Sequence, residues 1–429
     1  MVTGKYSNIT TQVPKSVRTP WAWVPTLYFV EGLPYFIVNT ISVVMFKDMG
    51  MDNGTLALVT SLIGLPWVIK PVWSPFVDIL RSKRWWIVAM QALMALAVAL
   101  IAVRVSVFSL TLIFFTIAAF ASATHDISAD GFYMLALSER QQSVFVGIRN
   151  TFYRIAMVFG QGVIVVLAGL LQRHYGSVTT AWSVTLVSTA AILAGFTVYH
   201  SLVLPRPSED GNRGAKTAGQ VFREFAAVFS SFFTKKGVWL AVAFMLLFRL
   251  PEALSVKMLY PFFSDPVQTG GLGFDKEAYG LVYGTFGVIA LLAGGILGGL
   301  HIAGRGLKQC LLPMALALAL PCSVYLYMSI AQPASLGIVG LCVVADQFGY
   351  GYGFTAYTMY MIRFADGPLK TSHYAICTGF MALSMLLPGL VAGYVQQLLG
   401  YRGFFIFVMI CCLATIFVTL SARRHLPSA

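Results

Sequence analysis

Charged residues are scarce in this chain of 429 residues. Asp, Glu, Lys and Arg together make up 10% of it, whereas 58% of its residues are hydrophobic. A soluble domain carries about 25% charged residues, and so apolar a chain has too few polar groups to cover a surface that faces water. The composition therefore excludes a soluble globular protein and indicates an integral membrane protein.

Cysteine is rare as well, and no group of residues has the spacing of a metal site. The six cysteines fall within apolar stretches of the second half, where they suit packing better than a disulfide framework. We therefore expect no metal and no cofactor. The first 22 residues are polar and lack the compact apolar core of a cleavable signal peptide, so the first apolar run is expected to stay in the mature protein.

The formal net charge is +13, because basic residues outnumber acidic ones. The basic residues occur in short clusters between apolar stretches and form no single patch, so we expect no nucleic acid partner. Clusters of this kind set the orientation of membrane helices. If the amino terminus is cytoplasmic, only five lysines and arginines fall in outer segments: Lys47, Arg104, Arg173, Lys276 and Arg402. This bias predicts that both termini face the cytoplasm.

Apolar runs long enough to cross a bilayer, which takes about 20 residues, occur twelve times. They predict an all-α integral membrane protein with twelve transmembrane helices. The expected helices of the first half are 24–46, 53–79, 85–104, 107–137, 141–171 and 178–203. Those of the second half are 237–263, 276–300, 307–331, 334–363, 372–399 and 402–421. Seven prolines inside these runs are expected to bend their helices: Pro34, Pro66, Pro71, Pro75, Pro251, Pro321 and Pro388.

The longest polar break, 204–236, divides the runs into two sets of six. Its segment from Gln220 to Phe233 is amphipathic and suits a helix that lies along the membrane surface. The expected layout is a cytoplasmic segment 1–23, a six-helix bundle 24–203, a cytoplasmic linker 204–236, a second six-helix bundle 237–421 and a cytoplasmic tail 422–429. Two six-helix halves joined by a cytoplasmic loop resemble the major facilitator fold, in which substrate binds between the halves.

Six charged residues of the first half fall inside expected helices, where a charge costs at least about 2.5–3.5 kcal/mol on insertion scales. They are three acids and three bases at similar depth: Glu31, Lys70, Asp126, Asp130, Arg149 and Arg154. Asp126 and Asp130 are four residues apart and so face one side of their helix. Two interpretations stay open. Either the set is a neutralised network that locks the half together, or Glu31, Asp126 or Asp130 accepts a coupling proton and releases a basic partner to bind substrate.

The second half carries fewer charges inside expected helices. Arg249 and Glu252 are one turn apart and are expected to pair with each other, whereas Lys257 lies near the outer end, where its side chain can reach the membrane interface. The candidate substrate-binding residues combine these charges with aromatic rings that suit the flat faces of a sugar: Tyr28, Tyr35, Lys70, Arg149, Arg154, Arg249, Tyr350 and Tyr357. Packing is the alternative role for the rings.

A turn after the second expected helix carries an acid followed by basic residues: Asp78, Arg81, Lys83 and Arg84. It resembles the major facilitator loop motif, in which these roles brace the cytoplasmic side. The match is partial, because the usual glycine four residues before the acid is Ser74 and the glycine that follows the acid is missing.

Three stretches of the first half form a more specific pattern: LYFVEGLP at 27–34, KPVWSPFVD at 70–78 and ASATHDISADG at 121–131. They resemble the LYFxxGLP, KPLWSPLVD and SATQDIxxDA stretches of the AmpG-type muropeptide permeases, whose relatives include acetyl-CoA transporters. His125 stands in place of a glutamine and Gly131 in place of an alanine. The resemblance implies proton-driven import of anhydromuropeptides, amino-sugar pairs with a short peptide, from periplasm to cytoplasm.

The two sets of helices and the charges inside them predict a secondary transporter, which we expect to be a monomer in the bilayer. The resemblance implies that it imports anhydromuropeptide-like cell-wall fragments with protons across the bacterial inner membrane. Another amphiphilic cargo stays open, such as a drug, a siderophore, a peptide or an acyl-CoA. A membrane-embedded transferase is less favoured because the loops carry no nucleophile–base or metal cluster. A channel is less favoured because twofold repetition and bent helices suit alternating access. We therefore expect no enzymatic activity.

Overall fold

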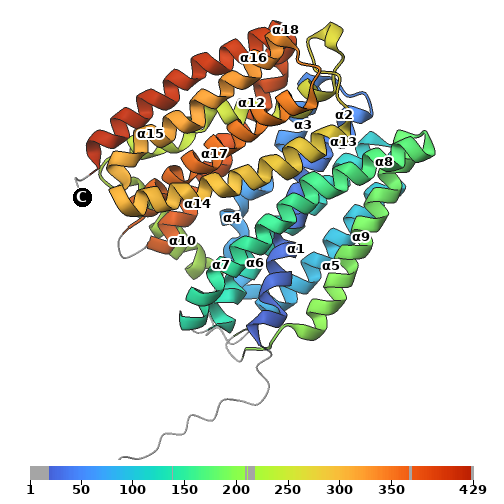
Figure 1. Ribbon diagram of the computed structural model, residues 1–429. Coiled ribbons are helices and arrows are strands. Elements are labelled where there is room, and N and C mark those ends of the chain that lie inside the picture. The colour runs from blue at the N-terminus through green and yellow to red at the C-terminus, as the bar shows by residue number, and fades with distance from the viewer. Residues whose placement is uncertain (1–18, 138, 208–209, 211–217, 367–369, 427–429) are drawn as a thin grey trace, which may run out of the picture.

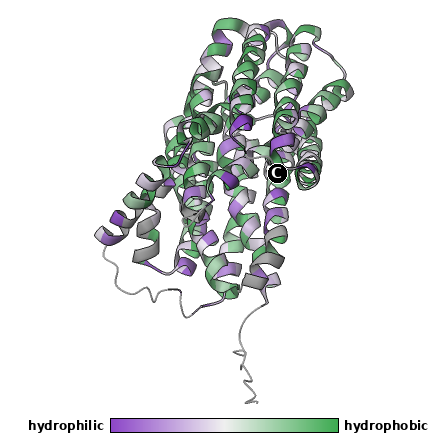
Figure 2. Cartoon of the chain, turned by 90° about the vertical axis from the view of Figure 1, so that its left-hand side faces the viewer, coloured by the Kyte–Doolittle hydropathy of each residue, from purple (hydrophilic) through white to green (hydrophobic). Residues whose placement is uncertain are grey.

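The structure is a computed structural model that describes residues 19–137, 139–207, 210, 218–366 and 370–426. Every regular element within these ranges is a helix (Figure 1). Figure 2 shows hydrophobic residues along most of the length of these helices. Many large hydrophobic side chains are exposed, among them Leu341, Leu398 and Phe417, which agrees with the membrane protein that the composition predicts.

The first part of the chain forms a group of helices that we call the N-terminal group. Its α-helices are α1 Val24–Phe36, α2 Ser42–Asp48, α3 Asn53–Leu62, α4 Leu65–Leu80, α5 Lys83–Val103, α6 Phe108–Ala136, α7 Glu139–Val158, α8 Val165–Tyr175 and α9 Val178–Val203. A short 3-10 turn and two π-turns belong to it: η1 Pro20–Ala22, η2 Ile37–Ile41 and η3 Phe159–Ile164.

The later part forms the C-terminal group, preceded by α10 Ala218–Phe233. Its α-helices are α11 Val238–Leu247, α12 Leu250–Ser264, α13 Lys276–Tyr279, α14 Val288–Arg305, α15 Leu307–Ala319, α16 Ser323–Ala331, α17 Leu336–Phe364 and α18 Lys370–His425. Short turns connect some of them: η4 Val267–Thr269, η5 Gly280–Gly287 and η6 Leu320–Cys322. In Figure 1 the N-terminal group (blue to green) lies beside the C-terminal group (yellow to red).

Nine helical runs among the described residues are long and apolar enough to cross a membrane. One of them, His373–His425, spans 53 residues and joins two expected helices. The chain bends there at Gly400, whose φ of 65° lies in the left-handed region that glycine adopts without strain. Helices α3, α4 and α17 are not among the nine, so the expected number of twelve stays a prediction.

Proline marks some of the helix breaks. Pro66 lies in the first turn of α4 and Pro251 in the first turn of α12, and each new helix begins where the previous one ends. Proline suits this position because its missing N–H would be unpaired there anyway. By contrast, α4 runs on through Pro71 and Pro75, and α18 runs on through Pro388. Prolines were expected to bend these helices. At some of them the chain instead starts a new helix, and at others the helix continues.

The two groups meet closely along one part of their boundary. Helix α3 packs along α18 and α12, η3 packs against η5, and α8 packs against α13. At Gly393 of α18 an added Cβ would overlap the backbone carbonyl of Asn53 in α3. Glycine is required at this position because only a bare backbone allows the two helices to approach so closely.

Helix α10 confirms the helix expected near 220–233, and it packs on protein as well. It contacts α4, α11 and α18, and Phe232 is fully buried. Ser231 of α10 lies 2.9 Å from a ring nitrogen of His373 in α18, and the Lys235 ammonium donates to the carbonyl oxygen of Phe364 at 2.7 Å. The linker helix is thus attached to the C-terminal group.

Candidate substrate cavity

A cavity of about 440 Å³ lies between the two groups. Helices α1, α4, α6 and α7 line it from the N-terminal group, and α12, α17 and α18 line it from the C-terminal group. Its size falls in the range of small-molecule sites. Its lining includes seven acidic and basic residues: Glu31, Lys70, Asp126, Arg154, Arg249, Glu252 and Lys257.

Two ion pairs hold the charges of α6. The Lys70 ammonium in α4 pairs with the Asp126 carboxylate, and Arg149 in α7 pairs with Asp130 at 2.8 Å. The Tyr28 hydroxyl donates to the same Asp130 carboxylate at 3.3 Å, and the Arg149 guanidinium lies 4.5 Å from the centre of the Tyr28 ring. The i, i+4 spacing of the two aspartates thus serves two different cationic partners.

Glu31 of α1 is an acid of this region that forms no ion pair within the described part of the chain. Its side chain is 7% exposed, and its Oε2 atom has no hydrogen-bond partner in the described part of the chain. Glu31 and Asp126 lie close enough for a hydrogen bond between their carboxyl groups. Because a carboxylate only accepts hydrogen bonds, such a bond requires a proton on one of the two.

His125 is turned away from this pair, toward a separate polar chain. Its Nε2 atom lies 2.9 Å from the Gln91 side-chain amide, and Gln91 in turn contacts His200 at 3.0 Å. His200 also lies 3.0 Å from the Thr26 hydroxyl. These buried contacts join α1, α5, α6 and α9, and sequence reasoning did not find them because each residue is isolated in an apolar run.

In the C-terminal group, Arg249 pairs with Glu252 at 3.0 Å, as the one-turn spacing suggested. The break between α11 and α12 places Arg249 against α17. There it donates to the Tyr350 hydroxyl at 2.8 Å and lies 4.9 Å from the centre of the Phe354 ring. Tyr350 and Phe354 both line the cavity.

The expected aromatic residues are placed differently from one another. Tyr35 and Tyr350 line the cavity, whereas Tyr28 and Tyr357 are not in its lining. Tyr357 is fully buried, donates to the carbonyl oxygen of Met245 at 2.6 Å and stacks on Phe248. Its contacts are those of a packing residue.

Two further cations face the cavity without a carboxylate partner among the described residues. Arg154 contacts the sulfur of Met157 at 3.8 Å. Lys257 is 8% exposed and donates to the backbone carbonyl of Thr60 at 3.3 Å. The expectation that Lys257 reaches the membrane interface is therefore wrong, because α12 turns this side chain inward toward α3.

The loop after α4 contacts the linker. The backbone N–H groups of Lys83 and Arg84, at the start of α5, donate to the Asp210 carboxylate at 2.7 and 3.0 Å. The Arg84 side chain donates to the carbonyl oxygens of Ser201 and Leu204. Arg81 is exposed, with its guanidinium 5.8 Å from the centre of the Trp85 ring. The side chain of Asp78 lies outside the described residues.

Lys83 also explains the glycine at 131. The Lys83 side chain is buried against α6, and a Cβ at Gly131 would overlap its Cε and Nζ atoms. Glycine at this position therefore leaves room for the lysine of the loop motif.

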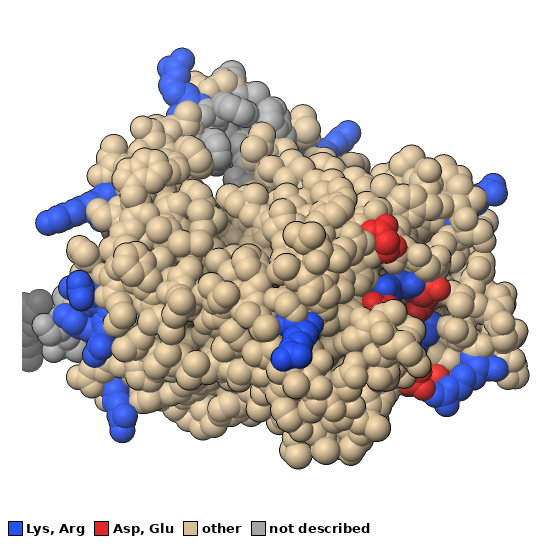
Figure 3. Space-filling model, turned by 90° about the horizontal axis from the view of Figure 1, so that it is seen from above, with Lys and Arg blue, Asp and Glu red and all other residues tan. Residues whose placement is uncertain are grey.

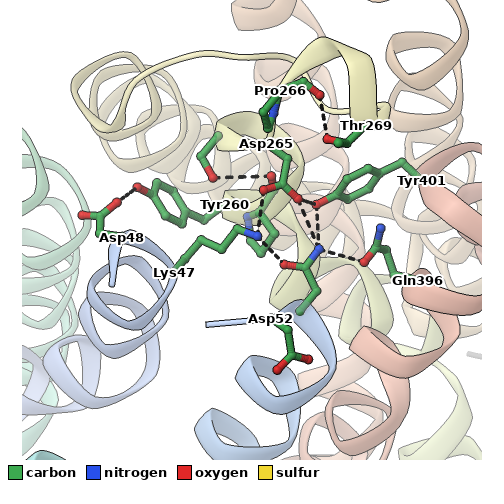
Figure 4. Close-up of polar contacts among 12 residues, drawn as sticks. Lys47, Asp48, Asp52, Tyr260, Asp265, Pro266, Thr269, Gln396 and Tyr401 are labelled. Atoms are coloured by element: carbon green, nitrogen blue, oxygen red, sulfur yellow. Dashed lines mark hydrogen bonds and ion pairs between the residues drawn. The ribbon is translucent and has the colours of Figure 1, made fainter. Parts of the chain in front are cut away.

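Polar side chains join the two groups at the end of the bundle away from α10. We call Lys47, Asn53, Asp265, Gln396 and Tyr401 the cross-group network. Lys47 pairs with Asp265 at 2.7 Å and donates to Asn53 at 2.6 Å, and the Tyr401 hydroxyl donates to Asp265 at 2.6 Å (Figure 4). The Asn53 amide donates to Gln396 at 2.8 Å.

A second set of contacts lies beside this network. The Asp48 carboxylate accepts hydrogen bonds from Tyr260 and Lys276 of the C-terminal group, and from the Trp182 indole at 2.8 Å. Figure 3 views the molecule from above and shows the exposed acids of that face gathered near basic side chains. These contacts could not be predicted from the sequence, because a charge at a helix end does not indicate which distant residue it pairs with.

The fold and cavity define a membrane transporter, and the comparisons place it in a family. A family model, Major Facilitator Superfamily, matches residues 26–368, and the chain belongs to that family. Two solved structures share the fold. A D-xylose-proton symporter matches with a TM-score of 0.72 and 11% identity, and the match covers 96% of this chain and 99% of the symporter. The nucleoside transporter NupG matches with a TM-score of 0.70 and 14% identity, and the match covers 96% of this chain and 100% of NupG. This chain is therefore a transporter and not an enzyme.

Within the family the chain is similar to AmpG-type permeases, as its sequence stretches suggested. It is 24% identical over 412 residues to Putative transporter AmpG 4 of Rickettsia felis, covering 93% of this chain and 95% of the relative. It is 23% identical over 407 residues to the Anhydromuropeptide permease of Escherichia coli, covering 93% of this chain and 79% of that permease.

Proposed function

We propose that this transporter imports anhydromuropeptide-like cell-wall fragments together with protons, by alternating access across the bacterial inner membrane. The observation that carries the proposal is the cavity between the two groups, whose lining combines a buried carboxyl pair with two cations that have no carboxylate partner among the described residues. The protein acts as a monomer with twelve transmembrane helices in two halves of six, and both termini face the cytoplasm.

The chemistry of the cavity supports an acidic cargo that contains sugar rings. Lys70 and Arg249 are neutralised by carboxylates, so Arg154 and Lys257 add positive charge that a carboxylate of the peptide part would balance. Tyr35 and Tyr350 present ring faces to the same space, which suits the apolar faces of amino sugars. The similarity to the Anhydromuropeptide permease of Escherichia coli agrees with this cargo.

The carboxyl pair supports proton coupling. A proton shared between Glu31 and Asp126 keeps two acids together in a buried site, and its loss would leave like charges in contact. Lys70 forms an ion pair with Asp126, so a change in the charge of Asp126 changes the strength of that ion pair. Asp130 and Arg149 form a second pair that can respond in the same way. Protonation of Asp126 would free Lys70, which lines the cavity, whereas Asp130 and Arg149 lie outside the cavity lining.

Uptake into proteoliposomes tests the proposal. Purified protein is reconstituted and supplied with labelled anhydromuropeptide, with and without an inward proton gradient. We expect accumulation that depends on the gradient and disappears when a protonophore is added. Equal uptake with and without the gradient would remove proton coupling, and no uptake by folded, inserted protein would remove the cargo.

A further inference from the structure

Lys257 is a buried cation for which the protein supplies no counter-charge among the described residues. It comes from α12 of the C-terminal group and donates across the boundary to the backbone carbonyl of Thr60 in α3. An ammonium group carries three N–H donors, and this carbonyl accepts only one of them. The remaining donors lie at the wall of the cavity.

The setting of Lys257 differs from that of the two paired cations in the same cavity. Lys70 and Arg249 each contact a carboxylate of the protein. A lone charge inside a transmembrane helix is costly, and such a charge usually has a partner or serves a function. Lys257 is therefore placed to bind an anion that comes from outside the chain.

A second unpartnered polar atom lies beside it. The Oγ atom of Ser61 is buried and has no hydrogen-bond partner in the described part of the chain. A Cβ added at Gly389 of α18 would overlap Ser61 Oγ and would lie 3.5 Å from Lys257 Cγ, so the two side chains adjoin the same point. Both residues line the cavity. A hydroxyl and an ammonium on adjoining side chains supply the kinds of donor that the oxygens of a carboxylate accept.

We propose that Lys257 and Ser61 form a carboxylate-binding subsite that selects acidic cargo. The subsite lies where α3, α12 and α18 meet, so a carboxylate held there contacts both groups of helices at once. This inference rests on the proposed function, because it names how that cargo is recognised. Arg154, which lines the cavity from α7 of the N-terminal group, can bind a second acidic group.

Binding to the purified full-length protein tests the subsite. The probes are anhydromuropeptide, an acetylated tripeptide with free carboxyl groups, and the amidated form of each, and the signal is the fluorescence of tryptophan, since Trp67 lines the cavity. A hydrogen bond to a charged group contributes about 1.5–3 kcal/mol. Lys257→Gln should therefore weaken binding of the free acids by about 10- to 150-fold and leave the amidated probes within about twofold.

Two more variants separate the subsite from a structural role. Lys257→Arg keeps the charge and should lose less of the preference for free acids than Lys257→Gln. Ser61→Ala removes only the hydroxyl and should weaken that preference by a few-fold, which gives a test if Lys257→Gln fails to fold. Lys236→Gln, an exposed lysine outside the cavity, is the matched control and should bind like the unchanged protein.

The outcomes distinguish this inference from the proposed function. If the unchanged protein binds anhydromuropeptide and its amide equally well, the subsite is refuted and the cargo proposal stands. If it binds the acidic tripeptide but no muropeptide, and Lys257→Gln abolishes that binding, the subsite stands and the cargo is wrong. Equal losses for acid and amide in Lys257→Gln show a structural lysine, and binding of neither free acid overturns both proposals.

Discussion

Glu31 and Asp126 face each other at the cavity, whereas Asp130 is held by Arg149 and Tyr28. These three acids were indistinguishable in the sequence. Their surroundings now separate them, because one oxygen of Glu31 is buried with no hydrogen-bond partner among the residues that the structure describes, while both aspartates have cationic partners. Glu31 is therefore the acid with most to gain from carrying a proton.

Replacing Glu31 by Gln tests this role. Glutamine imitates a permanently protonated acid, so Glu31→Gln should abolish gradient-driven accumulation of cargo while exchange of cargo across the membrane continues. Both are measured in the same proteoliposomes. Glu277→Gln is the matched control, since Glu277 pairs with Arg173 outside the cavity, and it should keep its gradient dependence. Gradient-driven accumulation by Glu31→Gln would rule out Glu31 as the coupling acid.

The Lys70–Asp126 pair leads to a prediction about stability. Lys70→Met leaves the Asp126 carboxylate without its cation, and we expect a loss of about 2.5–3.5 kcal/mol, as for a lone charge at a helix centre. The double variant Lys70→Met, Asp126→Asn removes both charges and should recover most of that loss. Thermal unfolding in detergent measures the difference. A double variant as unstable as Lys70→Met would show that the pair is not what stabilises this site.

The balance of charges in the first half predicted that acids and bases would meet, and the pairs of Asp126 and Asp130 agree with that. The sequence could not assign the partners, because the rotation of each helix depends on packing between helices. Lys257 shows the limit most clearly. Its position near a helix end suggested the interface, but the break before α12 and the contact with α3 turn it inward.

At the scale of helices, apolar runs predicted most elements within a few residues. The expected helix 178–203 is α9, and 334–363 lies within a few residues of α17. The breaks were harder, because the effect of a proline depends on whether neighbouring groups satisfy the freed carbonyls. The π-turns η3 and η5 carry no sequence signal at all, and they pack against each other between the two groups.

The contact of α18 with α3 gives a prediction at this scale. Gly393→Ala adds a methyl group where Asn53 approaches, so the two helices must move apart at that end. We expect transport to slow by at least about tenfold, since 1.4 kcal/mol of lost contact has that effect. Gly299→Ala is the control, because Gly299 is exposed with open space around it. Equal rates in the two variants would show that close approach at Gly393 is not required.

At the scale of the whole molecule, two groups of helices enclose a charged cavity and are joined at one end by the cross-group network (Figure 4). The chain belongs to the Major Facilitator Superfamily. In alternating access, two helix bundles move against each other about a central binding site, so contacts between the two groups bear on transport. On the proposed alternating-access mechanism, the network breaks and reforms in each transport cycle. Its strength sets how long that end of the protein stays closed.

Exchange of the charges of Lys47 and Asp265 tests the network. Lys47→Gln and Asp265→Asn each remove the ion pair and should favour opening of that end by about 1 kcal/mol, or about fivefold. A cysteine placed at Thr40 in the cavity reports the opening, because a thiol reagent added on that side should label it faster.

The swapped variant Lys47→Asp, Asp265→Lys should return labelling and transport toward their original rates. Asn53 and Tyr401, which contact Asp265, can keep their hydrogen bonds when the two charges are swapped, because an amide and a hydroxyl both donate and accept hydrogen bonds. Labelling of the swapped variant at the fast rate of the single variants would contradict the ion pair as the element that closes this end. The closure would then rest on the other contacts between the groups, namely those of Asp48 with Tyr260 and Lys276 and the glycine contact between α3 and α18.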